Sequence, residues 1–129
     1  MITSLYVSLI STWLIILSMR VIALRGNPMF KFFKFDKDDE NSMERAIRGH
    51  SNLIEYSPIF LILLYLAETS SFNIIYIHCL GSVFFLGRLM HGFCFAFIKS
   101  NMFLRVGGTA ITFGILGVLS AHLLVNYIF

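Results

Sequence analysis

The chain has 129 residues and a formal net charge of +3, and 57% of its residues are hydrophobic. Its mean hydropathy is +0.80. A soluble domain of this size could not bury so many apolar side chains, and several stretches reach the length of about 20 residues that spans a bilayer. The composition therefore excludes an ordinary soluble domain and predicts one integral membrane domain over residues 1–129.

Four apolar stretches are predicted to be membrane-spanning helices, at residues 2–24, 46–68, 73–98 and 105–128. The first stretch lacks the basic start and the small-residue cleavage site of a secretory signal, so it is expected to be a helix of the protein itself. The expected fold is therefore an all-α bundle of four transmembrane helices.

The ten Lys and Arg residues all fall in or beside the connections between helices one and two and between helices three and four. The positive-inside rule places these connections in the cytoplasm and both termini on the other side. The net charge then reflects topology and attraction to membrane lipid headgroups, and no nucleic-acid-binding surface is predicted.

The first connection contains the most polar segment, Lys31–Glu40. Its alternating Phe and Lys residues are typical of a segment at the membrane surface. Asp36, Asp38 and Glu40 partly match a calcium-binding loop, but the Gly at the turn and the final Glu ligand are missing.

Neither the cysteines nor the histidines predict a metal site or a disulfide. Cys79 and Cys94 are fifteen residues apart on one predicted helix, so they are too distant to bond and are expected to be small buried side chains. A metal site would need His50, His91 and Glu55 to converge, and no HxxxH or ExxH pair prepares one.

A polar cluster marks the start of the second span. At 100° per residue, Arg48, Asn52 and Glu55 fall on one face of the helix, while His50 points elsewhere. Ionisable groups are costly at membrane depth, so this cluster is a functional-site hypothesis by default.

The third span carries a second polar group, in which Arg88, His91 and Phe95 share one face. Glu55 and Arg88 are expected about 15 Å below the same interface, on adjacent antiparallel helices. We therefore expect them to form an ion pair. This pair could serve a site, hold the two helices together, or do both.

The fourth span has a seam of small residues, which predicts close helix packing within the chain or between subunits. The seam consists of Gly107, Ala110, Gly114, Gly117 and Ala121.

Two motifs resemble those of the MAPEG family, the membrane-associated proteins in eicosanoid and glutathione metabolism. They are Arg48-x-His50-x-Asn52-x-x-Glu55-x-x-Pro58 and Gly87-Arg88-x-x-His91. The sequence around the first motif is most similar to the small bacterial branch, and the resemblance covers nearly the whole chain. It implies a homotrimer in the bacterial inner membrane, with glutathione bound between subunits near the cytoplasmic face.

The resemblance also implies roles for single residues. Arg105 would be the catalytic residue. Arg20 or Arg25, together with Arg105, would correspond to the family's thiol-side and carboxylate-side arginines, and the alignment leaves the choice between Arg20 and Arg25 open. The residues implied to bind glutathione are Arg25, Arg48, His50, Asn52, Glu55, Arg88 and His91, of which Arg48 and His50 could act by supporting the others.

Three positions depart from the family pattern. Phe95 stands where prostaglandin- and leukotriene-forming members usually have Tyr, Ser51 stands where some members have Arg, and Val106 stands where the prostaglandin synthase has Ser. The missing hydroxyl groups argue against an eicosanoid substrate and against a hydroxyl-assisted mechanism.

The residue types suit glutathione on chemical grounds as well. Glutathione has two carboxylates and one ammonium, so its site needs several cations and a carboxylate such as Glu55. An Arg beside the sulfur would raise the thiolate fraction. The expected function is a membrane glutathione transferase or peroxidase that acts on lipophilic electrophiles arriving from the bilayer.

Two alternatives remain open. The protein could bind a lipid or small anion, or scaffold partners, without catalysis, and the Arg/Glu network would then be purely structural. Independently of this choice, Arg20 could extend to the membrane surface or face the pocket. A small transporter is less favoured, because one polar cluster near one face forms no path through the membrane and the half-helix repeats of transporters are missing.

Overall fold

The computed structural model describes residues 1–99 and 101–129 and contains four long helices and one short 3₁₀ helix. The elements are α1 (Ile2–Leu24), η1 (Pro28–Phe33), α2 (Ser42–Thr69), α3 (Ile74–Phe97) and α4 (Met102–Ile128). The predicted all-α helical bundle is confirmed, and each predicted span coincides with one long helix to within a few residues.

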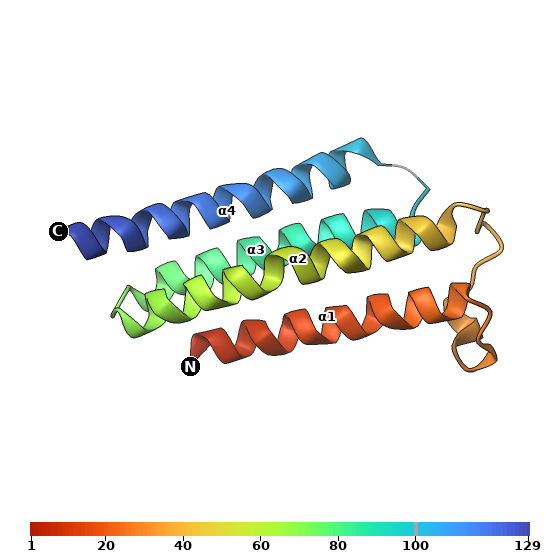
Figure 1. Ribbon diagram of the computed structural model, residues 1–129, viewed down its shortest axis with the longest axis horizontal. Helices are drawn as coiled ribbons and strands as arrows, with labels where there is room; N and C mark the ends of the chain where they lie inside the picture. The colour runs from red at the N-terminus through yellow and green to blue at the C-terminus, as the bar shows by residue number, and fades with distance from the viewer. Residues whose placement is uncertain (100) are drawn as a thin grey trace.

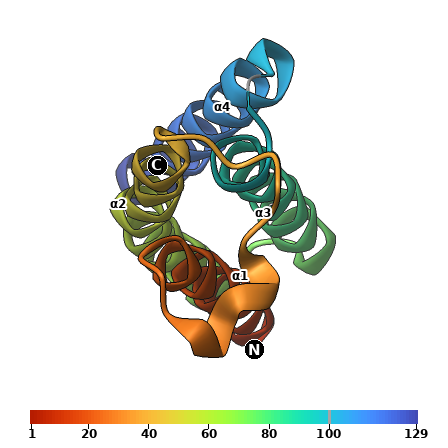
Figure 2. The ribbon, with the colours of Figure 1, turned by 90° about the vertical axis from the view of Figure 1, so that its right-hand side faces the viewer.

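The helices run antiparallel to their neighbours in the chain, and α2 and α3 lie between α1 and α4 (Figures 1 and 2). In the part of the chain that the structure describes, α1 and α4 do not contact each other. Both termini and the α2–α3 turn lie at one end of the bundle. We call the opposite end, which carries η1 and the α3–α4 connection, the basic end.

Three of these helices, α1, α3 and α4, are long and apolar enough to cross a membrane. Helix α2 has 28 residues, or about 42 Å of length, against a hydrocarbon thickness of about 30 Å. It is therefore long enough, but Arg48, Asn52 and Glu55 reduce its hydropathy. Helix α2, which carries the polar cluster, is therefore less apolar than the three candidate membrane spans.

The apolar core lies between α1, α2 and α3. The rings of Phe60 and Phe84 stack with centroids 3.7 Å apart, and Leu17 and Leu64 are fully buried members of the same core. Helix α4 contributes little to this core, mainly through Leu119. In lipid such packing holds helices together through van der Waals contact, because lipid tails are as apolar as the side chains.

Small residues bring α3 and α4 together at Gly108, which is not part of the predicted seam. A Cβ atom at Gly108 would lie 2.7 Å from the carbonyl oxygen of Gly87 and 2.9 Å from the Cβ of His91. A Cβ atom at Gly114 or Gly117 would have no neighbour within 4 Å. Among the described residues, the predicted seam therefore faces away from the rest of this chain at these two positions.

Arg20 anchors the first connection to the bundle. It is 2% exposed, and it donates hydrogen bonds to the carbonyl oxygens of Ala96 and Phe33 and to both carboxylate oxygens of Asp38. Arg20 is therefore bound to the first connection at the end of the bundle and does not face the polar cluster. The Arg20 guanidinium also holds the pKa of Asp38 below its ordinary value of 3.8. Both carboxylate oxygens of Asp38 thus accept hydrogen bonds from Arg20, which is a further argument against calcium binding by this segment.

The two cysteines are free and differ in exposure. Cys94 is buried, as predicted, but Cys79 is exposed on the outer side of α3. The prediction for Cys79 is wrong for the single chain, because α3 is covered by other helices on only part of its circumference.

Candidate functional site

The predicted polar face of α2 lines an open cleft of about 320 Å³ together with α3. The lining residues are Ile47, Arg48, Ser51, Asn52, Glu55, His91 and Phe95. Asn52 and Glu55 come from α2 and His91 from α3, so the structure unites the two polar groups that the sequence placed on separate helices. We call this space the polar cleft.

Arg88 lies behind the polar cleft and joins three helices. It is 1% exposed, its Nη1 donates a hydrogen bond of 2.9 Å to the hydroxyl of Thr112, and its Nη2 donates to Oδ1 of Asn52. The guanidinium also lies 5.7 Å from the ring centre of Tyr56. Arg88 thus connects α3 to both α2 and α4.

The expected ion pair between Glu55 and Arg88 is not formed. Among the described residues, no carboxylate oxygen lies within 4.0 Å of the Arg88 guanidinium, and Glu55 is exposed on the open side of the cleft. Asn52 lies about one helical turn before Glu55 on the same face, and the guanidinium is turned toward it and toward Thr112. The result is a buried cation held by neutral groups and a carboxylate left free beside it.

His91 forms the wall of the polar cleft. It is 5% exposed, and its ring stacks on that of Phe95 with centroids 4.7 Å apart. Its Nδ1 is buried and has no hydrogen-bond partner in the described part of the chain. The guanidinium of Arg105 lies 5.6 Å from the centre of the same Phe95 ring. Phe95 is therefore placed between His91 and Arg105.

A second cleft of about 130 Å³ adjoins the polar cleft at Phe95. Its lining residues are Arg45, Cys94, Phe95, Lys99, Asn101, Met102 and Arg105. We call it the basic cleft. Phe95 lines both clefts, and its ring contacts Arg105 in the basic cleft and His91 in the polar cleft.

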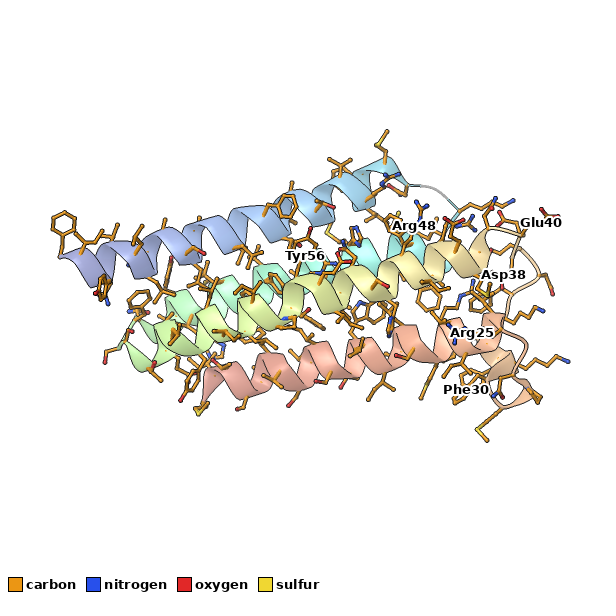
Figure 3. The ribbon with its side chains drawn as sticks, in the orientation of Figure 1. Arg25, Phe30, Asp38, Glu40, Arg48 and Tyr56 are labelled. Carbon is orange, nitrogen blue, oxygen red and sulfur yellow. The ribbon has the colours of Figure 1, made fainter. Side chains whose placement is uncertain are left out.

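Arg48 lines the polar cleft and forms a weak ion pair with a residue outside it. Its guanidinium pairs with Glu44 one turn earlier on α2, and both side chains are more than half exposed. Such surface pairs are worth little, about 0.3–0.5 kcal/mol, so Arg48 can exchange this partner for a ligand carboxylate. Figure 3 shows Arg48 toward the basic end of α2 and Tyr56 nearer the middle of the helix.

Two expected site residues lie elsewhere in the single chain. His50 faces α1, where its Nε2 lies 3.0 Å from the hydroxyl oxygen of Ser18. Arg25 is exposed at the end of α1, apart from Arg48 (Figure 3). Neither residue lines the polar cleft. His50 contributes to the contact between α1 and α2, and Arg25 lies outside the polar cleft of its own chain.

Sequence reasoning missed two side chains that support the site. Tyr56 follows Asn52 by four residues, so helical spacing could have placed it on the same face. Thr112 is a polar residue inside an otherwise apolar helix, and it is fully buried. A buried hydroxyl in such a helix signals a partner on a neighbouring helix, here Arg88.

Comparison with known proteins adds to this geometry. The model of the MAPEG family matches residues 3–125, which include all or nearly all of each of the four long helices. The chain is also 32% identical over 95 residues to the inner membrane protein YecN of Escherichia coli strain K12, covering 74% of this chain and 70% of that protein. YecN of Escherichia coli O6:H1 matches to the same extent.

Proposed function

This chain belongs to the MAPEG family, the membrane-associated proteins in eicosanoid and glutathione metabolism, and from this premise we propose that it is a membrane-bound glutathione transferase or peroxidase acting on lipophilic electrophiles. The similarity to an inner membrane protein supports an inner-membrane location. The basic end, with its lysines and arginines, would then face the cytoplasm.

The observation that carries this proposal is the free carboxylate of Glu55 in a cleft edged by cations. Glu55 has no cationic partner within 4.0 Å among the described residues, so it is available for the ammonium group of glutathione. Arg48 is available for a carboxylate of the same ligand. Asn52 uses its amide oxygen for Arg88, and its amide nitrogen remains free to donate.

Arg105 is the residue that we propose activates the thiol. Its side chain is exposed at the basic cleft, and its guanidinium lies 5.6 Å from the centre of the Phe95 ring, which also lines the polar cleft. A guanidinium beside the sulfur favours the thiolate over the thiol. The thiolate sulfur would then form a bond to the electrophilic carbon, and the leaving group would depart with its electron pair. Phe95 and Val106 have no hydroxyl group, so this activation rests on charge.

We propose that the functional unit is a homotrimer with glutathione bound between subunits. Glu55 is exposed in the single chain, although it lies within the apolar part of α2. A carboxylate facing acyl chains would be costly, and a neighbouring subunit would cover it. The same neighbour would bring Arg25, which is remote from its own cleft, toward the ligand.

The decisive experiment is a glutathione titration of the purified protein, read by thermal unfolding and by the ultraviolet absorbance of the thiolate. Wild type should show a glutathione-dependent rise in unfolding temperature, a thiolate signal and conjugation of a generic aryl halide. Arg105→Gln should keep the thermal shift and lose conjugation at least about tenfold. Lys31→Gln, which removes a charge from the exposed surface of η1, is the matched control.

If wild type showed neither a glutathione-dependent thermal shift nor conjugation, the transferase proposal would be wrong. If Arg105→Gln abolished the thermal shift as well, Arg105 would be a binding residue and not the activating one.

A second function is favoured by the way Arg88 is held. Its hydrogen bonds to Asn52 and Thr112 join three helices, which is what a purely structural network would do. In that case the protein would bind a lipid or small anion without catalysis. Glu55→Gln separates the two functions. Loss of glutathione affinity with intact assembly supports the transferase, whereas weaker assembly with unchanged ligand response supports the structural network.

A further inference from the structure

The basic end holds more cations than its carboxylates can neutralise. Arg45, Lys99 and Arg105 line the basic cleft, where Asp39 is the nearest carboxylate within reach of two of them. Asp39 lies 3.0 Å from Arg45 and 3.7 Å from Lys99, so one negative charge is shared by two positive ones. These three cations and one carboxylate leave a local excess of two positive charges.

Asp38 does not remove this excess. Asp38 accepts hydrogen bonds on both of its carboxylate oxygens from the buried Arg20. This pair is neutral and fully engaged. Lys37 lines an adjoining cleft of about 190 Å³ together with Arg45 and Lys99, which adds a further positive charge on that side.

Arg45 is held in place for binding an anion. Its Nη2 donates a hydrogen bond of 3.0 Å to the hydroxyl of Ser42 and pairs with Asp39. Its Nε is buried and has no hydrogen-bond partner among the residues that the structure describes. The start of α2 thus fixes the guanidinium at the wall of the cleft, with one donor unused.

The size and position of the basic cleft suit a phosphate group. Its volume of about 130 Å³ equals that of roughly four water molecules, which is room for one tetrahedral anion. Met102 and Phe95 provide apolar surface in the same cleft, and Phe103 beside it is 77% exposed. Basic pockets between the ends of membrane helices are typical sites for anionic lipid headgroups.

We propose that Arg45, Lys99 and Arg105 bind a phosphate group, carried by an anionic phospholipid in the leaflet at the basic end or by free inorganic phosphate. This site adjoins the polar cleft at Phe95 and shares Arg105 with the proposed thiol chemistry, whereas Arg45 and Lys99 lie outside the polar cleft. Arg105 lines the basic cleft and contacts Phe95, which lines both clefts, so occupation of the phosphate site would position the arginine assigned to the thiol.

The test varies Lys99, because its side chain is 69% exposed and its replacement should leave the fold intact. Purified wild type, Lys99→Gln and Lys31→Gln would be titrated in detergent with phosphatidylglycerol and with phosphatidylcholine, and bound lipid counted by native mass spectrometry. Wild type should prefer phosphatidylglycerol. Lys99→Gln should weaken that preference about fivefold, the effect of one cation near a membrane surface. Lys31→Gln removes the same charge outside the cleft and should change the preference less than about twofold.

A titration with inorganic phosphate distinguishes the two possible ligands, an anionic phospholipid and the free phosphate ion. If phosphate alone raises the unfolding temperature of wild type but not of Lys99→Gln, and phosphatidylglycerol adds nothing, the ligand is the free ion. Arg45→Gln should repeat the loss seen with Lys99→Gln. Equal effects of Lys99→Gln and Lys31→Gln would overturn the site, as would equal retention of both lipids together with no response to phosphate.

Glutathione binding is followed in parallel, so that this proposal and the transferase proposal can fail separately. Lys99→Gln should keep the glutathione-dependent thermal shift. If it lost that shift and kept its lipid preference, the basic cleft would be part of the glutathione site and the phosphate proposal would be wrong.

Discussion

Arg88 is the side chain on which the site most depends. A buried guanidinium is costly unless its donors are satisfied. Here Nη1 and Nη2 donate to neutral oxygens of Thr112 and Asn52, whereas the buried Nε has no partner among the described residues. Removing one acceptor leaves a charged donor without a partner, which costs more than the hydrogen bond itself contributes.

Thr112→Val is expected to destabilise the protein by about 1–3 kcal/mol, because it keeps the shape of the side chain but removes the acceptor for Nη1 of Arg88. Thr109→Val is the matched control, since the Thr109 hydroxyl donates only to the carbonyl oxygen of Arg105 on its own helix. Thermal unfolding in detergent measures both variants. Equal losses for the two would show that the Arg88–Thr112 contact contributes nothing specific.

Asp38 is the second residue with a testable energetic role. Its pKa is lowered mainly by the hydrogen bonds from Arg20, against an ordinary value of 3.8. A carboxyl group whose folded pKa is depressed adds stability above its unfolded pKa, and this contribution is lost as the pH falls through the folded pKa.

Asp38→Asn should therefore unfold at a lower temperature than wild type at neutral pH, and the gap should close as the pH falls below 3.8, the ordinary pKa of this group. The measurement is the unfolding temperature between about pH 7 and pH 3. Asp36→Asn alters an exposed carboxylate in the same connection and should leave the wild-type pH profile unchanged. A gap that stays constant with pH would contradict a stabilising Asp38 carboxylate.

At the scale of the helices, the contact between α3 and α4 decides how the site is closed. Gly108 allows the α4 backbone to approach Gly87 and His91, and the same approach brings Thr112 to Arg88. Helix α4 adds little apolar core, so its position depends on this close contact and on the polar one beside it.

Gly108→Ala should destabilise the protein by about 1–3 kcal/mol, because the new methyl group meets backbone atoms that cannot move without separating the helices. Gly114→Ala adds the same methyl group where nothing lies within 4 Å, so it should leave the stability of the single chain unchanged or slightly raised. Thermal unfolding compares the two. A loss at Gly114 equal to that at Gly108 would show that the seam also packs closely, against another subunit.

At the scale of the whole molecule, the two ends of the bundle differ in charge. The basic end carries η1, the clefts and the Arg20–Asp38 contact, whereas the termini lie together at the other end. At the terminal end, the carboxylate of Glu68 accepts hydrogen bonds from the backbone nitrogens of Ile2 and Thr3, which ties the start of α1 to α2.

A C-terminal fusion tests the predicted orientation. Alkaline phosphatase fused after Phe129 should be active in bacterial cells, and green fluorescent protein at the same position should be dark, because both termini are expected outside the cytoplasm. Fusions within the connection between α1 and α2 should give the opposite pair of signals. A fluorescent C-terminal fusion would reverse the orientation and place the basic end outside.

The sequence by itself determined the membrane class, the number and extent of the long helices, and the shared face of Arg48, Asn52 and Glu55. These follow from composition, apolar length and the 3.6-residue helical period, which are properties of single segments. It also predicted that the polar groups of α2 and α3 would meet, and they do meet in the polar cleft.

Only the tertiary structure decided which side chains pair. Depth counting favoured Glu55 as the partner of Arg88, but the direction of the guanidinium selects Asn52 and Thr112. Arg20 likewise finds Asp38 across a loop whose path no periodicity predicts. Pairing depends on helix rotation and on differences of a few ångströms between neighbouring helices, and a one-dimensional pattern contains neither quantity.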